Sequence, residues 1–294
     1  MKTNTLPQVL PNWRDYLELC KPKVVLLMLV TVVVGMYLAT PGWVSLPLLG
    51  FSLAGIGLSA SSAAAINHLV DRRIDAIMDR TKKRPVAHGR ISINQALGFA
   101  LFIGALGLSL LVLFVNTLTA VLTFITLIGY AGIYTGYLKR ATSQNIVIGG
   151  LAGAAPPLLG WTAVTNQLDP QALLLVLIIF TWTPPHFWAL AIYRFEEYRH
   201  AKIPMLPVTH GIQFTKFSIY LYTILLLVVS ILPFVVGMSS WLYLIGALIL
   251  GGRFLFWAHR LYTSDKPVVA MQTFRFSIIY LLLLFVFLLL DHYY

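Results

Sequence analysis

One short run of the sequence carries three residues that together suit a metal ion. Asn67, Asp71 and Asp75 recur every four residues, so on a helix they share one face, about 6 Å apart per step. Mg²⁺ prefers carboxylate oxygens, waters and substrate phosphates to a closed cage of protein ligands. Like charges four residues apart mildly destabilise a helix, and a bound cation removes that repulsion. The spacing therefore predicts a Mg²⁺ site for a phosphorylated substrate, with these three residues at its catalytic centre.

Basic side chains follow directly after this run. They are Arg80, Lys82, Lys83 and Arg84. Arg and Lys beside a carboxylate-bound metal neutralise the charge that develops as a diphosphate leaves. The alternative is a solvated helix whose charges pair every four residues, but Asn67 at the edge of an otherwise apolar helix favours the metal site. Lys139 and Arg140 could also reach the diphosphate, although charges that only orient a chain in a membrane account for them equally.

A second acidic pair, Glu196 and Glu197, follows a later apolar run. The order of the apolar runs puts this pair on the same side of a membrane as the first group. Two carboxylate groups facing one diphosphate would allow more than one Mg²⁺ to bind. Either glutamate could be the direct ligand, and we predict Glu197 to join the first group. The alternative is a charge patch at the end of a helix.

His186 lies inside an apolar run, in the stretch WTPPHFW at residues 182–188. Its two prolines remove backbone donors and kink a spanning helix, which neighbouring helices or water must then repair. An ionisable side chain at that depth is a functional hypothesis by default. His186 could ligate an iron ion or transfer a proton. The alternative is a histidine that only hydrogen-bonds a neighbouring helix.

Small residues are dense at residues 145–157, in the stretch NIVIGGLAGAAPP. Such residues let helices approach closely, and they leave room for a flat or bulky ligand. Close packing alone accounts for any single glycine here.

The composition places all of these residues in a membrane protein. The 294 residues are 59% hydrophobic and 11% charged, with a mean hydropathy of +0.82, whereas soluble domains carry about 25% charged residues. Continuous apolar runs of roughly 18 residues mark spanning helices and argue against strands. The expected spans are 24–39, 46–70, 97–115, 118–137, 146–164, 173–192, 217–236, 241–257 and 276–290.

The basic residues indicate how the chain is oriented. All 21 Lys and Arg fall in the N-terminal segment or in and around the loops after the second, fourth, sixth and eighth spans. The positive-inside rule then places the N-terminus in the cytoplasm and the C-terminus outside. The net charge of +11 is mainly this signal, because separate short loops form no nucleic-acid surface. The polar start, without a signal-peptide pattern, favours a bacterial inner membrane.

The acidic residues also divide between the two sides. Of the 10 acidic residues, only Asp169 and Asp291 fall on the outer side. Outside the two acidic groups, we interpret Asp15, Glu18 and Asp265 as ordinary surface charges.

Taken together, these residues resemble the intramembrane aromatic prenyltransferases of the UbiA superfamily. The resemblance covers residues 1–294 as a single intramembrane domain. It implies an all-α fold, with nine transmembrane helices around a central cavity, and two acidic motifs that bind a prenyl diphosphate through Mg²⁺. Asn67, Asp71 and Asp75 match the first motif. The second motif usually includes Asp, where this chain has Glu196 and Glu197.

Within the superfamily, the chain resembles the branch that transfers farnesyl to haem. The stretches that carry this resemblance are Asp79-Arg80-Thr81 with Arg84-Pro85, Tyr137-Leu138-Lys139-Arg140, 153–157 (GAAPP), 182–188 (WTPPHFW) and 203–207 (IPMLP). It implies farnesyl diphosphate and haem B as substrates, haem O as product, and His186 as a haem contact. Haem-modifying enzymes or terminal-oxidase assembly factors are possible partners. The residues then expected to bind the diphosphate are Arg80, Lys83, Arg84, Lys139 and Arg140.

Two other functions compete with this interpretation, besides a purely structural role in oxidase assembly, which predicts that the acidic groups are dispensable. One is a related prenyltransferase with another aromatic acceptor, against which the residues around His186 argue. The other is a secondary transporter, whose ionisable groups would lie near the midplane on broken helices, often in repeated halves. Here the acidic residues gather at one face, and only the Pro184-Pro185 pair suggests a broken helix.

Overall fold

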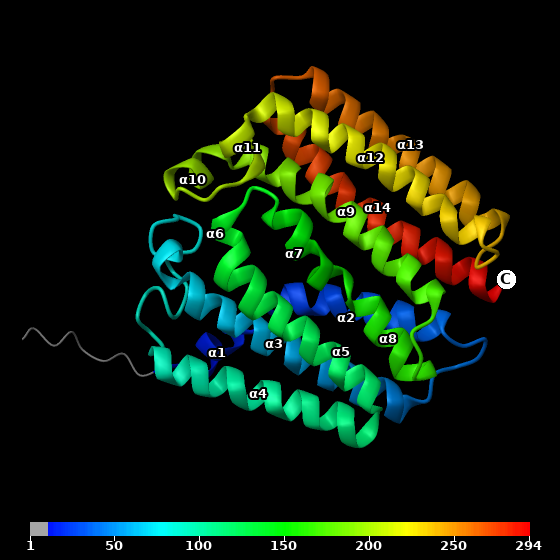
Figure 1. Ribbon diagram of the computed structural model, residues 1–294, viewed down its shortest axis with the longest axis horizontal. Coiled ribbons are helices and arrows are strands. Elements are labelled where there is room, and N and C mark those ends of the chain that lie inside the picture. The colour runs from blue at the N-terminus through cyan, green and yellow to red at the C-terminus, as the bar shows by residue number, and fades with distance from the viewer. Residues whose placement is uncertain (1–10) are drawn as a thin grey trace, which may run out of the picture.

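The computed structural model describes residues 11–294, and these fold into fourteen α-helices and one π-helix without any strand (Figure 1). The expected all-α fold is confirmed. The elements are α1 (Trp13–Leu19), α2 (Pro22–Leu38), α3 (Leu46–Asp75), α4 (Ile93–Phe114), α5 (Thr117–Ile128), η1 (Gly129–Leu138), α6 (Lys139–Ala141), α7 (Asn145–Ala154), α8 (Pro156–Thr165), α9 (Pro170–Tyr193), α10 (Phe195–His200), α11 (Leu206–His210), α12 (Ile212–Val235), α13 (Trp241–Thr263) and α14 (Pro267–Tyr293).

Eight helical segments of residues 11–294 are long and apolar enough to cross a membrane. A ninth is present if α1 and α2, which are bent by 51° at their junction, form one span. Two expected spans consist of joined elements: α5, η1 and α6 make one, and α7 with α8 makes another. The segments agree with the apolar runs of the sequence. An apolar run in lipid forms a helix because its backbone must satisfy its own hydrogen bonds there.

Local sequence explains where many helices begin. Proline occupies the first turn of α2, α3, α8, α9, α11 and α14, where its missing N–H needs no partner. Ser92 and Gln95 form a capping box at the start of α4. Helix α9 runs through Pro184 and Pro185 without ending, so the two prolines leave one continuous spanning helix.

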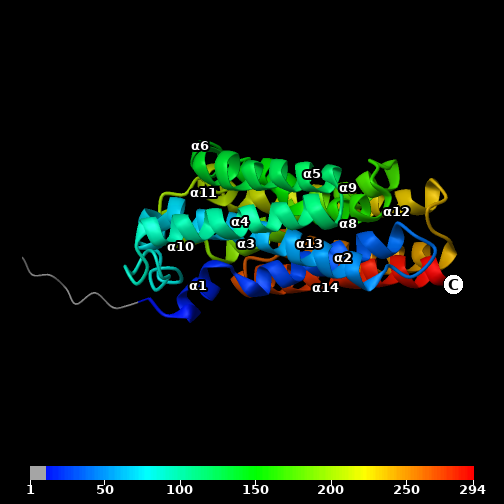
Figure 2. The same cartoon turned by 90° about the horizontal axis from the view of Figure 1, so that it is seen from below.

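The helices form a bundle whose two ends differ. Figures 1 and 2 both show α1, α6, α10 and α11 at one end and the C-terminus at the other. The loops rich in Lys and Arg thus meet at a single end, as their order in the sequence requires. Lys2, which belongs to the same basic group, lies outside the described residues.

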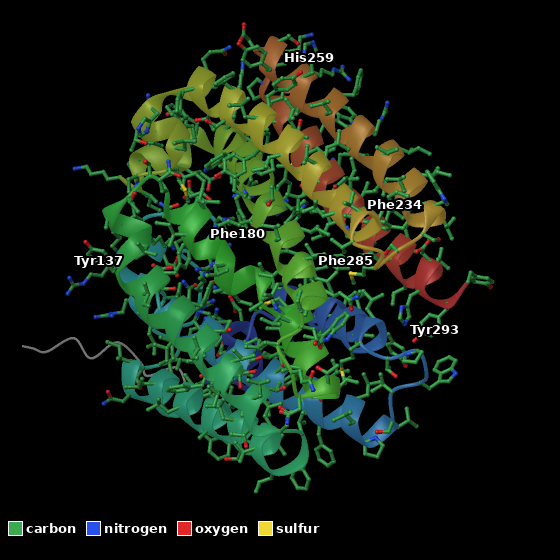
Figure 3. All side chains as sticks on the ribbon, turned by 45° about the vertical axis from the view of Figure 1, so that its right-hand side comes forward. Tyr137, Phe180, Phe234, His259, Phe285 and Tyr293 are labelled. Carbon is green, nitrogen blue, oxygen red and sulfur yellow. The ribbon has the colours of Figure 1, made fainter. Side chains whose placement is uncertain are left out.

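Helix α9 is central to the packing, because it contacts α7, α12 and α14. Figure 3 shows Phe285 of α14 within the side chains of the bundle and Tyr137 at its outer edge. Helices α2 and α8 approach each other closely. A Cβ atom at Gly160 would lie 2.1 Å from the Val32 carbonyl oxygen, so only glycine permits this approach.

One sequence interpretation is wrong. Asp15 is not an ordinary surface charge, since only 5% of it is exposed. Its carboxylate accepts the Asn12 N–H at 3.0 Å and forms an ion pair with Arg90. Arg90 also pairs with Glu18 at 3.2 Å and donates to the Lys83 carbonyl at 2.7 Å. The loop after α3 folds back over α1, and the sequence around Asp15 carries no sign of that long-range contact.

Candidate active site

The three residues of the first acidic group lie together on α3. Asn67, Asp71 and Asp75 are buried, with 4%, 0% and 3% of their surfaces exposed. Asn67 Nδ2 donates to Asp71 Oδ2 at 2.9 Å, which joins two of them directly. The helix therefore presents an acidic face to the interior of the protein at the end of the bundle where the basic loops gather.

Asp71 is held by basic residues that follow η1. Lys139 Nζ lies 2.5 Å from Asp71 Oδ2. Arg140 Nη2 is 3.9 Å from Asp71 Oδ1 and donates to the Val70 carbonyl at 2.9 Å. Tyr137, in the same stretch of residues 137–140, does not face Asp71: it is 68% exposed and faces outward (Figure 3). Two of the five basic residues expected to bind the diphosphate, Lys139 and Arg140, thus reach Asp71.

Asp75 is held by the loop that follows its own helix. Arg84 Nη1 donates to Asp75 Oδ1 at 2.9 Å and to Oδ2 at 2.8 Å. Thr81 Oγ1 donates to the Asp75 backbone carbonyl at 3.0 Å. These contacts fold the loop against the end of α3 and place the Arg84 guanidinium beside the acidic face.

Lys21 and Thr135 complete the surroundings of Asn67, and the sequence analysis missed both roles. Lys21 Nζ donates to Asn67 Oδ1 at 2.5 Å, and Asn67 Nδ2 also donates to Thr135 Oγ1 at 3.3 Å. Lys21 lies between α1 and α2, where it looked like one more topology charge. Its adjoining proline, which begins α2, is the only local signal of a special position.

The donors on α3 fit a divalent cation. Asp71 Oδ1 is buried and has no hydrogen-bond partner, since Arg140 is 3.9 Å away, so its lone pairs are available to a cation that comes closer. No group of three or more His, Cys, Asp or Glu residues gathers within residues 11–294. Few protein ligands suit Mg²⁺, which completes its shell with waters and substrate phosphates.

Lys21, the partner of Asn67, lines a cavity of about 550 Å³ between the helices. Tyr130, Tyr134, Gly153 and His186 contribute to its largely apolar wall. A Cβ atom at Gly153 would meet nothing within 4 Å. The glycine-rich stretch therefore widens the cavity here, whereas Gly150 packs against Thr183. One end of an apolar chamber thus lies beside the acidic face.

The π-helix η1 shapes this end of the chamber. It stacks Tyr130 on Tyr134, with ring centroids 5.5 Å apart, and Thr135 Oγ1 donates to the Tyr130 carbonyl at 2.8 Å. π-Helical turns are rare and frequently mark functional sites. The sequence carries one weak sign of it, three glycines within residues 129–136, because glycine weakens an ordinary α-helix.

His186 lies deeper in the cavity wall, on α9. Only 7% of it is exposed, and its ring stacks on Trp182 at 4.2 Å and on Phe274 at 4.5 Å. Its Nδ1 atom is 2.7 Å from Ser277 Oγ of α14. The alternative of an interhelical hydrogen bond is therefore realised, and the same ring lines the chamber.

The second acidic pair is arranged differently. On α10, Glu196 pairs with Arg199, and Glu197 lies 3.3 Å from Arg194. Within residues 11–294, no hydrogen bond or ion pair joins either glutamate to Asp71 or Asp75. The Glu196 side chain is 70% exposed and that of Glu197 36%. Glu197 is thus the less exposed of the two.

The loop after α3 and the segment around α10 nevertheless lie side by side. Met78 belongs to one apolar cluster with Ile203 and Leu206, and Tyr198 packs against it. Burial raises the pKa of the Tyr198 phenol, while the nearby Arg80 and Arg194 oppose that rise. Arg80 thus reaches the second acidic segment, whereas Lys83 is exposed and contacts neither group through its side chain within residues 11–294.

The chain matches known proteins over its whole length. A model of the UbiA prenyltransferase family matches residues 28–289. "Protoheme IX farnesyltransferase" of Legionella pneumophila (strain Lens) is 79% identical over 100% of both chains. "Protoheme IX farnesyltransferase 1" of Pseudomonas aeruginosa (strain UCBPP-PA14) is 61% identical over 96% of this chain and 94% of its own.

Solved structures share the fold. A structure described as digeranylgeranylglyceryl phosphate synthase aligns with a TM-score of 0.81 at 18% identity, covering 95% of this chain and 98% of its own. A UbiA homologue from Archaeoglobus fulgidus, bound to GPP and Mg²⁺, aligns with a TM-score of 0.62 at 16% identity, covering 93% and 99%. The arrangement of helices is therefore common to these proteins.

Proposed function

The chain belongs to the UbiA prenyltransferase family, and from this membership we propose that it transfers farnesyl from farnesyl diphosphate to a vinyl group of protohaem IX (haem B), making haem O. The names of relatives at 79% and 61% identity support this acceptor and donor. The carrying structural observation is that Lys21, which binds the buried acidic face of α3 at Asn67, also lines an apolar cavity. That arrangement suits a substrate with a charged head and a long hydrocarbon tail.

The diphosphate would bind at the acidic face through the cations that surround it. Arg84 and Lys139 already contact the carboxylates of Asp75 and Asp71, so a diphosphate there would meet fixed positive charges. Arg80 and Lys83 on the loop after α3, and Arg140 on α6, would neutralise its outer oxygens. Mg²⁺, held by Asn67, Asp71, Asp75 and Glu197, would supply a Lewis acid that polarises the leaving oxygens. The A. fulgidus homologue bound to Mg²⁺ supports this role.

In the reaction, the bond between farnesyl C1 and the diphosphate oxygen breaks, and its electron pair leaves with the diphosphate. A new carbon–carbon bond forms between C1 and the terminal carbon of the haem vinyl group. The remaining vinyl carbon is then cationic, takes the oxygen of a water molecule, and releases a proton from that water. The apolar cavity wall would exclude water until the bond to C1 has formed, and His186 would position the haem.

We also propose that the chain acts as one intramembrane domain in a bacterial inner membrane, with its N-terminus in the cytoplasm. The apolar helices make it a multi-pass membrane protein, and the bacterial relatives support the location. The gathering of basic loops at one end supports the orientation (Figure 1). Diphosphate would then bind and leave on the cytoplasmic side. A haem-modifying or terminal-oxidase assembly partner would take up the product.

Haem analysis tests the proposal directly. The chain is expressed in a bacterial host without its own haem farnesyltransferase, and extracted haems are weighed by mass spectrometry. We expect a haem heavier by one hydroxyethylfarnesyl group. Asp71→Asn should abolish it, whereas Glu18→Gln, the same chemical change on a partly exposed side chain, should not. Haem B alone, from folded wild-type protein, would refute the acceptor and direct the search to other aromatic acceptors.

A further inference from the structure

Ser277 of α14 is completely buried and lies against His186. Its Oγ atom makes two short contacts, 2.7 Å to His186 Nδ1 and 2.6 Å to the Phe274 carbonyl oxygen. Its backbone carbonyl accepts the Trp182 indole N–H at 2.7 Å. One residue of α14 therefore fixes two neighbouring aromatic rings of α9, and nothing in the proposed reaction accounts for its hydroxyl group.

The two short contacts determine where the protons lie. Two oxygen atoms 2.6 Å apart need a proton between them, so the Ser277 hydroxyl donates to the Phe274 carbonyl. A serine hydroxyl carries a single proton. The 2.7 Å contact with His186 must then be donated by the ring, which places a proton on Nδ1. A neutral imidazole protonated there has its lone pair on Nε2.

The second ring nitrogen of His186, Nε2, is the one available to a ligand in the cavity. Within residues 11–294, His186 Nε2 accepts no hydrogen bond and is not among the fully buried unpaired atoms, and the His186 side chain lines the chamber. Stacking on Trp182 and on Phe274 restrains the ring. A flip of the ring would break the bond to Ser277, and a change of tautomer would turn the Ser277 hydroxyl toward Nδ1 and break its bond to the Phe274 carbonyl.

We propose that Ser277 is a positioning residue that holds His186 in the tautomer and orientation whose Nε2 binds the iron of the haem substrate. This inference rests on the proposed function, because it assigns the haem contact of that same site. Metal-ligating histidines usually donate their other ring N–H to a fixed acceptor, which sets the tautomer and raises the basicity of the ligand. Here Ser277, itself anchored to the α14 backbone, is that acceptor.

The test uses the full chain in lipid nanodiscs with ferrous haem B, and reads the iron–histidine stretch by resonance Raman together with haem affinity. His186→Ala should remove the stretch. Ser277→Ala should shift the stretch and weaken haem binding by about tenfold or more, whereas Ser277→Thr, which keeps the hydroxyl, should restore both. Thr273→Val is the matched control, because Thr273 is equally buried one turn earlier and its hydroxyl donates to the Val269 carbonyl at 2.9 Å.

Each outcome decides between the inference and the proposed function. A wild-type stretch and affinity in Ser277→Ala would overturn the inference, as would equal losses in Thr273→Val, which would indicate general destabilisation of α14. Farnesylated haem made by a wild type without an iron–histidine stretch would overturn the inference alone. The proposed function alone would be overturned if Ser277→Ala shifts the iron–histidine stretch while the wild type makes no farnesylated haem. A wild type that binds no haem would overturn both.

Discussion

The two acidic groups contain the same kind of side chain in opposite settings. On α3, Asp71 and Asp75 are buried and each is paired with a cation from a different segment. On α10, Glu196 and Glu197 pair with arginines three residues away in the sequence, Arg199 on the same short helix and Arg194 at its start. Exposed pairs of that kind contribute little to stability, about 0–1 kcal/mol. Removing one partner of a buried pair is far more costly. The first group is thus held by distant parts of the fold, whereas the second is held by local pairs.

The largest effect is expected at the buried group. Arg84→Gln leaves the Asp75 carboxylate buried without its partner, which should lower the free energy of unfolding by about 3 kcal/mol or more. It should also slow prenyl transfer by about 100-fold, because a charge beside the leaving group is lost. Unfolding of the purified protein in detergent and haem product assays measure these two effects.

A double variant sharpens this prediction. Asp75→Asn combined with Arg84→Gln removes both charges, so it should recover much of the stability lost by Arg84→Gln without recovering activity. Equal stability of Arg84→Gln and the wild type would contradict the distinction between the two acidic groups. Recovery of activity in the double variant would show that Asp75 is not needed for the chemistry.

The sequence predicted the first acidic face because helical periodicity alone puts residues 67, 71 and 75 together on α3. Composition and runs of hydropathy likewise predicted the spans, since a bilayer imposes both length and apolarity. Neither signal tells which distant segment will cover a face. Lys21 and Thr135 reach Asn67 across 46 and 68 residues of chain, and Asp15 is buried only because a later loop folds over it.

The π-helix illustrates a second limit. Residues 129–138 are apolar enough to continue the span of α5, and their three glycines weaken an ordinary helix without specifying a π-helix. The wider turn is stabilised by tertiary contacts, such as the bond between Asn67 and Thr135, so its presence depends on the assembled site. The side chains of Tyr130 and Tyr134 were therefore absent from the predicted site although they line the cavity.

A smaller effect is expected for the less exposed glutamate of α10. Glu197→Gln should reduce kcat/KM for farnesyl diphosphate by about tenfold, as expected when one supporting group of a metal site is lost. Its stability should change by less than about 1 kcal/mol, because its pair with Arg194 is partly exposed. Activity measured across a range of Mg²⁺ concentrations should show a higher requirement for the metal. An unchanged requirement would remove Glu197 from the predicted ligands.

The smallest effect is expected next to it. Glu196→Gln removes the same charge from the same turn of α10, but this side chain is 70% exposed and its partner Arg199 is 62% exposed. Solvent screens such a pair, so the folding equilibrium constant and kcat/KM should each stay within about twofold of the wild-type values. Glu196 thereby serves as the matched control for Glu197. A loss at Glu196 that exceeds the loss at Glu197, in the same Mg²⁺ titration, would identify Glu196 as the direct ligand. It would also mean that α10 turns toward α3 when substrate binds, because the more exposed glutamate would then have to rotate inward to reach the metal.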